Sequence, residues 1–128
     1  MTEKQAALAI KRAYAAPSPA DGRRVLVDRL WPRGVSKARL QLDAWIRDLA
    51  PSTELRKWFN HDPARWDEFV RRYREELQAP EQQELLSTLS EQAAQGALTL
   101  VYGARDTEHN EAVVLLDVLG ARRIGRGR

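Results

Sequence analysis

The fold is decided by residues 97–119, ALTLVYGARDTEHNEAVVLLDVL. Residues 97–103 are mostly apolar, which is typical of a strand that is buried on both faces of a sheet. The polar residues 103–110 predict a loop. Residues 111–119 are apolar around most of a helical surface, so we expect a buried helix that Gly120 ends. A strand, a loop and a helix in this order favour an α/β domain.

The preceding part of the chain extends this pattern. Residues 7–13 and 23–28 predict two further strands, and the Pro- and Gly-rich residues 15–22 predict the connection between them. Since a parallel crossover usually needs a dozen residues or more, the short connection leaves open whether these two strands are parallel.

Helices are predicted between the second strand and residue 97. The first is indicated by helical spacing and is closed by Pro51, with apolar positions at Leu42, Trp45, Ile46 and Leu49. Ser52 is a typical cap for a short helix, and Asp62-Pro63 is a strong start signal for another. That helix carries one apolar stripe, which we interpret as core: Trp66, Phe69, Val70, Tyr73 and Leu77. A last helix begins at Pro80 and ends at Gly96.

The fold prediction is therefore an α/β class domain with a small, mostly parallel sheet flanked by helices. Its 128 residues suffice for one core, so we expect a single domain over residues 1–119. The basic residues 120–128 predict a flexible Gly/Arg-rich tail. Without the four arginines of residues 122–128 the chain has 17 basic and 18 acidic residues, so the net charge of +3 comes from this tail.

Composition excludes several classes of function. The chain has no cysteine, which excludes thiolate chemistry and is typical of a cytoplasmic protein. Two histidines, His61 and His109, cannot form a three-histidine zinc site, and there is no glycine-rich nucleotide motif. We therefore predict no metal and no cofactor. No apolar run approaches the roughly 20 residues of a membrane span, so no membrane partner is expected.

Two loops combine the residues that carry chemistry. In open α/β sheets, ligands bind beyond the carboxyl ends of the strands, and residues 28–34 and 103–110 each follow a predicted strand there. Arginine matches the geometry of phosphate or carboxylate groups, so Arg29, Arg33 and Arg105 are predicted to hold an anion. His109 is the candidate acid or base, with Asp28 or Asp106 to orient it. Lys37 and Asn110 complete the predicted rim.

Each of these residues also has a structural interpretation. Asp106 or Asn110 is a typical cap for the helix that follows. Trp31, beside Pro32, is more typical of a packed lid over the core than of a ligand contact. His61 directly precedes Asp62, and we interpret it as part of the junction between two helices.

Three segments closely resemble a known family: residues 21–37, DGRRVLVDRLWPRGVSK; residues 45–77, WIRDLAPSTELRKWFNHDPARWDEFVRRYREEL; and residues 98–115, LTLVYGARDTEHNEAVVL. Over residues 9–119 the chain resembles the YeaO-like branch of the family called domain of unknown function 488. The resemblance implies a small cytoplasmic bacterial α/β domain and supplies no activity.

The broader family's pattern is similar to a strand followed by Asp and Arg near a Pro, and later a Cys-His-Arg triplet that opens a helix. In this chain Asp28, Arg29, Pro32 and Arg33 match the first part, and His109 matches the triplet's histidine. Glu108 and Asn110 stand where the cysteine and arginine would be. This departure from the family's pattern puts cysteine-dependent chemistry in doubt here.

The leading hypothesis is a protein that binds an anionic small molecule, phosphorylated or nucleotide-like, at the two loops. Whether it is an enzyme, which reaction it would catalyse and its oligomeric state are left open. One alternative is a nucleic-acid-binding accessory protein that uses the basic tail and the rim arginines. Another is a protein-docking patch around Trp31.

Overall fold

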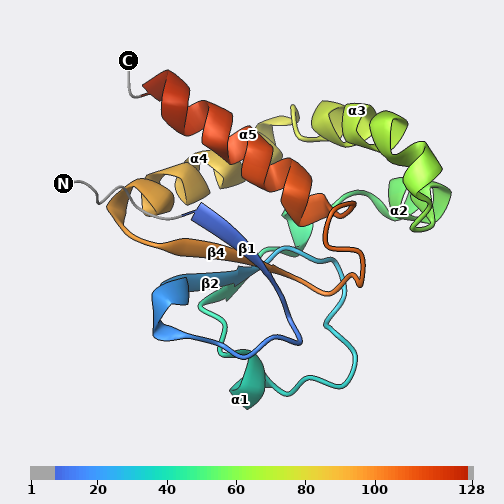
Figure 1. Ribbon diagram of the computed structural model, residues 1–128. Helices are drawn as coiled ribbons and strands as arrows, with labels where there is room; N and C mark the ends of the chain where they lie inside the picture. The colour runs from blue at the N-terminus through green and yellow to red at the C-terminus, as the bar shows by residue number, and fades with distance from the viewer. Residues whose placement is uncertain (1–7, 127–128) are drawn as a thin grey trace.

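The protein is built on one parallel four-stranded sheet. The computed structural model describes residues 8–126, and the side chains of residues 8–122. The sheet order is β1 (Leu8–Arg12), β4 (Leu98–Tyr102), β2 (Arg23–Leu26) and β3 (Ala44–Trp45). Figure 1 labels the first three of these strands. The predicted α/β class is confirmed. The first predicted strand included residue 7, which lies outside the described residues.

The central strand is the last one in the chain. β4 pairs in parallel with β1, with Leu98 opposite Leu8, and in parallel with β2, with Leu98 opposite Arg23. β1 and β2 are therefore parallel to each other without being neighbours. Residues 13–22 cross from one side of β4 to the other, with a 3-10 turn at Pro19–Asp21. This answers the question of strand direction that the sequence left open.

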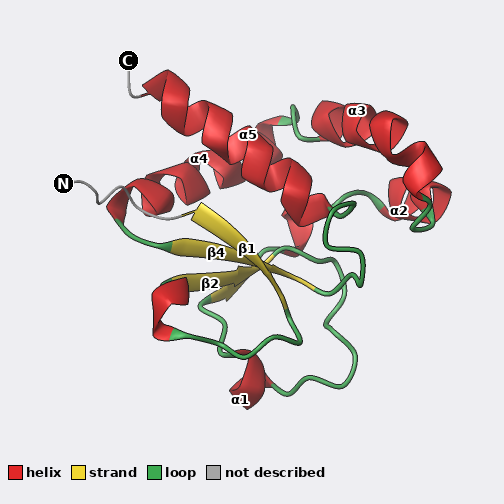
Figure 2. Ribbon diagram, viewed as in Figure 1, coloured by secondary structure: helices red, strands yellow, loops and turns green. Residues whose placement is uncertain are grey.

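Both faces of the sheet are covered, as the continuous apolar runs predict. Figure 2 shows α4 (Pro80–Gln95) and α5 (Glu111–Arg126) over one face, and α1 (Lys37–Leu40) with long loops on the other. Because successive strand residues point to opposite faces, Leu100 joins the larger core beneath α4 and α5. Val101 joins a smaller core with Leu26 and Leu40.

The predicted helix starts are confirmed by their capping bonds. Ser52 Oγ accepts the amide of Leu55 at 3.1 Å where α2 (Thr53–Phe59) begins. Asp62 Oδ1 accepts the amide of Ala64 at 3.0 Å and opens a 3-10 turn that leads into α3 (Trp66–Glu76). α4 begins at Pro80 and ends before Gly96. The predicted apolar stripe of α3 belongs to the larger core: Trp66, Phe69, Val70, Tyr73 and Leu77.

The helix predicted over residues 42–49 is wrong. This segment forms the short strand β3 and then a 3-10 turn at Arg47–Leu49. The reason is that its apolar residues serve two different cores. Leu42 and Trp45 pack in the smaller core, whereas Ile46 and Leu49 pack in the larger one. The spacing fits one face of a helix, but the side chains lie on the two sides of the sheet.

The prediction that Gly120 ends the last helix is also wrong, because α5 continues to Arg126. The guanidinium of Arg122 donates to Gln83 Oε1 at 2.6 Å and to Ser87 Oγ at 3.1 Å, and both acceptors lie on α4. These bonds hold the extra turns against the neighbouring helix. The predicted tail therefore begins inside α5, and residues 127–128 lie outside the described residues.

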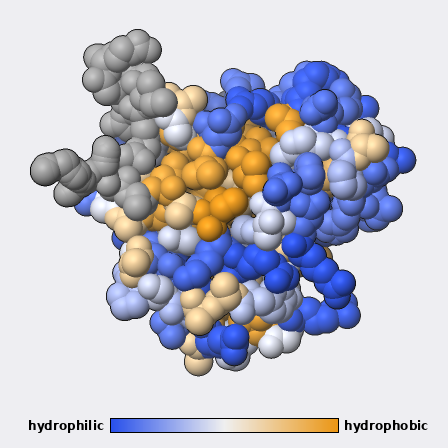
Figure 3. Space-filling model, viewed as in Figure 1, coloured by the Kyte–Doolittle hydropathy of each residue, from blue (hydrophilic) through white to orange (hydrophobic). Residues whose placement is uncertain are grey.

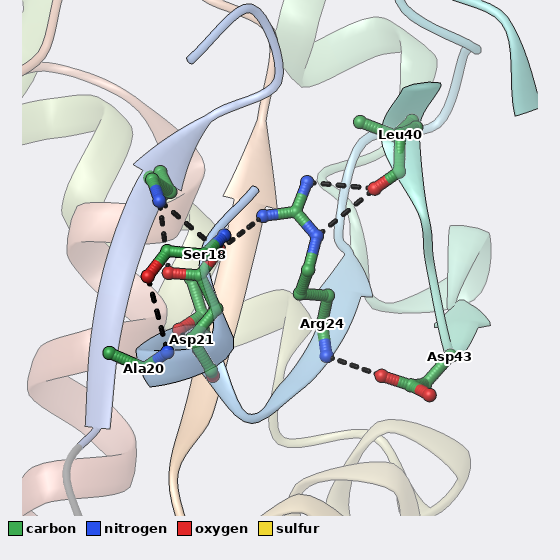
Figure 4. A network of polar contacts seen from close by, with 8 residues as sticks. Ser18, Ala20, Asp21, Arg24, Leu40 and Asp43 are labelled. Carbon is green, nitrogen blue, oxygen red and sulfur yellow. Dashed lines mark hydrogen bonds and ion pairs between the residues drawn. The ribbon is translucent and has the colours of Figure 1, made fainter. Parts of the chain in front are cut away.

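A buried polar network fixes the crossover to the sheet (Figure 4). Arg24 Nη1 donates to Asp21 Oδ2 at 2.7 Å, and Arg24 Nε and Nη2 donate to the carbonyl oxygen of Leu40 at 3.0 and 2.8 Å. Lys11 Nζ lies 3.0 Å from Asp21 Oδ1. Burial opposes ionisation of Asp21, but the bonds from Lys11, Ser18 and Arg24 outweigh it and lower its pKa.

The surface differs between the helices. In Figure 3 apolar residues gather over α5 and β1, whereas the surface of α3 is hydrophilic. That surface of α3 is crossed by ion pairs of Arg71 and Arg72 with Glu68, at 2.7 Å each. Across residues 8–126, no helix is long and apolar enough to cross a membrane.

Candidate functional site

The two loops predicted to carry chemistry meet at the carboxyl ends of β2 and β4. These strands are parallel neighbours, so the loops that follow them lie side by side. The amide of Gly103 donates to Asp28 Oδ2 at 2.8 Å and joins one loop to the other. A Cβ atom on Gly103 would lie 3.0 Å from that same carboxylate oxygen, so the glycine leaves room for Asp28.

The conformation of the loop of residues 28–34 is fixed by hydrogen bonds from two tryptophans, Trp31 of the loop itself and Trp45 of β3. Trp31 Nε1 donates to the carbonyl oxygen of Val35 at 2.6 Å, and Trp45 Nε1 donates to that of Asp28 at 2.7 Å. Their rings meet edge to face with centroids 5.4 Å apart. Trp31 packs against the smaller core, as the structural interpretation expects, and it also lines the pocket beside this loop. Gly34, with φ of 80°, supplies the turn.

The loop of residues 103–110 is organised by Asp106. Its Oδ1 accepts the amides of Glu108 and His109 at 2.9 and 3.0 Å, and its Oδ2 lies 2.9 Å from His109 Nδ1. The amide of Glu108 first, and then the ring of His109, lower the pKa of Asp106. Asn110 Oδ1 accepts the amide of Val113 at 3.1 Å, so Asn110 caps α5. The predicted orienting contact between Asp106 and His109 is present.

A pocket of about 290 Å³ lies between these loops and α2. Figure 1 shows α2 and α3 beyond the carboxyl ends of the strands, on the same side as the 103–110 loop. The stacked rings of Phe59 and Phe69, with centroids 4.4 Å apart, form its apolar wall. Its titratable and charged lining comes from both loops, the middle of α2, the turn after α2 and the start of α5, together with Tyr14: Tyr14, Asp28, Arg29, Arg33, Arg56, His61, His109 and Glu111.

Two carboxyl groups face each other in this lining. Glu111, the first residue of α5, shares a side-chain hydrogen bond with Asp28. The residue is only half-buried, but its carboxyl is surrounded by protein atoms. That burial first, and then the hydrogen bond and charge of Asp28, raise the pKa of Glu111 well above its ordinary value, against a smaller opposing effect of Arg56.

The three arginines of the pocket differ in what they already bind. Arg29 is tied to the chain, since its Nε and Nη2 donate to the carbonyl oxygens of Pro51 and Ala50 at 3.3 and 3.4 Å. Arg33 and Arg56 donate no side-chain hydrogen bond, and form no ion pair within 4 Å, with any other residue whose side chain is described. Their guanidinium groups line the pocket with donors to spare.

The structure brings together part of the predicted residue set. Asp28, Arg29, Arg33, His109 and Asn110 line the pocket. Asp106 stands behind His109, and Lys37 and Arg105 are exposed outside the lining.

The lining also includes Arg56, His61 and Glu111, which have no role in the predicted site. Glu111 begins a helix, where an acidic residue commonly stabilises the helix start, so its position in the sequence indicates a structural role and not a place in a binding site. Arg56 enters the pocket only because α2 folds over the two loops. His61, with φ of 55°, does lie at the predicted junction between helices. Within residues 8–122, no group of three or more His, Asp or Glu side chains is arranged to hold a metal ion.

The sheet and the pocket beyond its strand ends define a small open-sheet α/β domain. The model of the inactive DUF488-N3 subclade matches residues 7–124. The chain is 44% identical over 109 residues to the uncharacterized protein YeaO of Escherichia coli K12, covering 85% of this chain and 93% of YeaO. It is 40% identical over 113 residues to an uncharacterized protein of Mycobacterium tuberculosis H37Rv, covering 88% of this chain and 93% of that protein. The chain has no match among solved structures.

The chain therefore belongs to the YeaO-like branch of the DUF488 family, as its sequence resemblance predicts.

Proposed function

We propose that the protein binds a small anionic molecule, phosphorylated or nucleotide-like, in the pocket between the 28–34 and 103–110 loops. The observation that carries this proposal is that Arg29 and Arg33 of the 28–34 loop and Arg56 of α2 line one pocket. Guanidinium groups that line one pocket repel one another until an anion binds between them, and their planar donors fit phosphate or carboxylate oxygens.

The size and lining of the pocket support a small ligand. Ligand pockets commonly span roughly 300–1,000 Å³, and about 290 Å³ lies at the lower end of that range. The wall formed by Phe59 and Phe69 offers an apolar surface opposite the arginines. A phosphorylated compound with a flat or apolar part would use both.

Binding without cysteine chemistry fits the residues of the 103–110 loop. Glu108 and Asn110 occupy the positions that flank His109, and Asn110 is engaged as the helix cap. His109, with Asp106 behind its ring, is placed to move a proton for a bound ligand. The description of the matching family model as inactive supports a binding role.

The alternative of nucleic-acid binding by the basic tail gains no support from the described part of the tail. Arg122 is engaged with α4 through Gln83 and Ser87. Nucleic-acid binding would appear as salt-sensitive binding of oligonucleotides that deletion of residues 121–128 weakens.

We expect inorganic phosphate, ribose 5-phosphate or a nucleoside monophosphate to raise the melting temperature relative to chloride at equal ionic strength. A ligand that binds only the folded state must raise its apparent stability. Arg56→Gln should lower the affinity for the best of these ligands roughly 10- to 100-fold, since a hydrogen bond to a charged group is worth about 1.5–3 kcal/mol. Isothermal titration calorimetry measures this change.

Lys57→Gln is the matched control, because Lys57 is the next residue of α2, is exposed and lies outside the pocket lining. Its affinity should equal that of the wild type. The proposal fails if no member of the panel shifts the melting temperature, or if Arg56→Gln and Lys57→Gln bind the ligand equally well.

A further inference from the structure

The pocket wall holds two carboxyl groups with no cation beside them. Asp28 ends the segment that continues β2, and Glu111 begins α5. Their side chains are hydrogen-bonded to each other. The amide of Gly103 donates a hydrogen bond of 2.8 Å to Asp28 Oδ2 and so fixes this carboxylate. Neither carboxyl lies within 4 Å of a cationic group among the residues whose side chains are described.

A hydrogen bond between two carboxyl groups needs a proton. Ionised carboxylates are acceptors only, so two of them in contact repel each other unless one is protonated or a cation lies between them. The other groups facing the pair do not neutralise it directly. They are Arg29 from its own loop, Arg56 from α2, Tyr73 from α3, Tyr102 from β4, and His61 and His109 across the pocket. Arg29 already serves two carbonyl oxygens.

We propose that Asp28 and Glu111 hold one proton between them, and that the pocket binds an oxyanion only while they hold it. This inference rests on the proposed anion site and specifies its ligand as a molecule with an oxyanion group, in contrast to a cation. With the proton in place, the three arginines outweigh one negative charge. Without it, two adjacent carboxylates face the incoming anion.

The surroundings of Glu111 agree with this arrangement. Burial, followed by the hydrogen bond and charge of Asp28, raises the pKa of Glu111. The coupling is reciprocal, because an anion that binds better to the protonated pair must in turn favour its protonation. Glutamine at position 111 reproduces the shape and the uncharged state of protonated glutamate, so Glu111→Gln fixes the pocket in its binding form at every pH.

The shared proton is tested first without any ligand. The side-chain carboxyl ¹³C resonance of Glu111 in the labelled protein should keep the chemical shift of a protonated carboxyl well above pH 4.5, the ordinary pKa of the group. The resonance is assigned by its disappearance in Glu111→Gln. Ionisation near its ordinary pKa of 4.5 would overturn the proposal, whatever the pocket binds.

The coupling is tested with sulfate, a probe whose own charge does not change between pH 6 and pH 9. Sodium sulfate is titrated at constant ionic strength while the amide resonances of Gly103 and Glu111 are followed. Above the pH at which the pair loses its proton, the sulfate dissociation constant of the wild type should rise up to tenfold per pH unit. Glu111→Gln should show a smaller rise, because only the effects of the histidines remain in that variant.

Glu108→Gln is the control for loss of one carboxylate, since Glu108 is exposed and outside the pocket lining. It should follow the wild type at every pH. Equal pH profiles of wild type and Glu111→Gln would overturn the coupling.

Two further results separate this inference from the proposed function. If neither sulfate nor the phosphate panel binds at any pH, the proposed function and the coupling both fail, and the ¹³C titration alone decides whether a proton is shared. If Mg²⁺ binds the wild type but not Glu111→Gln, the pair is a cation site and the proposal is wrong.

Discussion

Replacing Glu111 by glutamine is expected to make the folded protein progressively more stable than the wild type as the pH rises. The pKa of Glu111 is raised in the folded state, so the wild type is penalised once the unfolded chain can ionise this group. The favourable contribution is complete below the ordinary pKa of 4.5 and is lost as the pH rises toward the folded-state pKa. Each pH unit in that window costs the wild type about 1.4 kcal/mol of unfolding free energy.

Urea unfolding of the wild type and Glu111→Gln between pH 4.5 and pH 9 measures this effect. The difference in unfolding free energy should grow with pH in favour of the variant and then level off. Glu108→Gln should track the wild type throughout. Parallel pH profiles for the wild type and Glu111→Gln would show that Glu111 ionises normally.

Replacing Arg24 by leucine is expected to lower the free energy of unfolding by about 3–5 kcal/mol, the usual cost of breaking a buried ion pair from one side. The side chains of Arg24 and Asp21 are 4% and 10% exposed. Loss of the guanidinium leaves Asp21 with Lys11 as its remaining cation and strips the carbonyl oxygen of Leu40 of two donors. Against the roughly 5–15 kcal/mol by which small domains are stable, this is a large loss.

Arg23→Leu provides the matched comparison. Arg23 precedes Arg24 on β2, is exposed and forms no side-chain hydrogen bond or ion pair with another described residue. Its substitution should change the unfolding free energy by less than about 0.5 kcal/mol. A loss below about 1 kcal/mol for Arg24→Leu would mean that the network in Figure 4 is not a main support of the crossover.

Local signals explain which parts of the fold could be predicted. Ser52, Asp62 and Pro80 mark helix starts through hydrogen bonds or backbone angles that involve only residues within three positions of them. Each of these three predicted helix starts is correct. The apolar runs of β2 and β4 predict strands buried on both faces, and their pairing brings the two loops together. Because the two strands could be predicted, the sequence also indicated that the two loops after them form the candidate site.

The errors arise where distant contacts decide the local structure. Residues 42–49 have helical spacing, but their amides pair with β2: Asp43 donates to the carbonyl oxygen of Arg24 and Ile46 to that of Leu26. Likewise, the bonds of Arg122 to α4 carry α5 past Gly120. Tertiary hydrogen bonds override the local preference in both segments.

The residues of the candidate site that the sequence did not predict were missed for the same reason. Arg56 lies in a short helix that the sequence predicts correctly. The residues of that helix do not indicate that α2 packs over the two loops. Glu111 has the sequence signature of an ordinary helix start. Its proximity to Asp28, 83 positions earlier, depends on the parallel pairing of β2 and β4.

The position of β4 also constrains when the chain can fold during translation. β1 and β2 each pair in parallel with a strand that leaves the ribosome more than 70 residues later, and β2 otherwise meets only the two residues of β3. The nascent chain therefore has no complete sheet to fold onto until residue 102 is available. An incomplete translation product that stops before residue 98 lacks the strand that joins the two sides of the sheet, and with it Gly103, His109 and Glu111 of the pocket. Completion of the sheet, and with it of the pocket, therefore waits for residues 98–111.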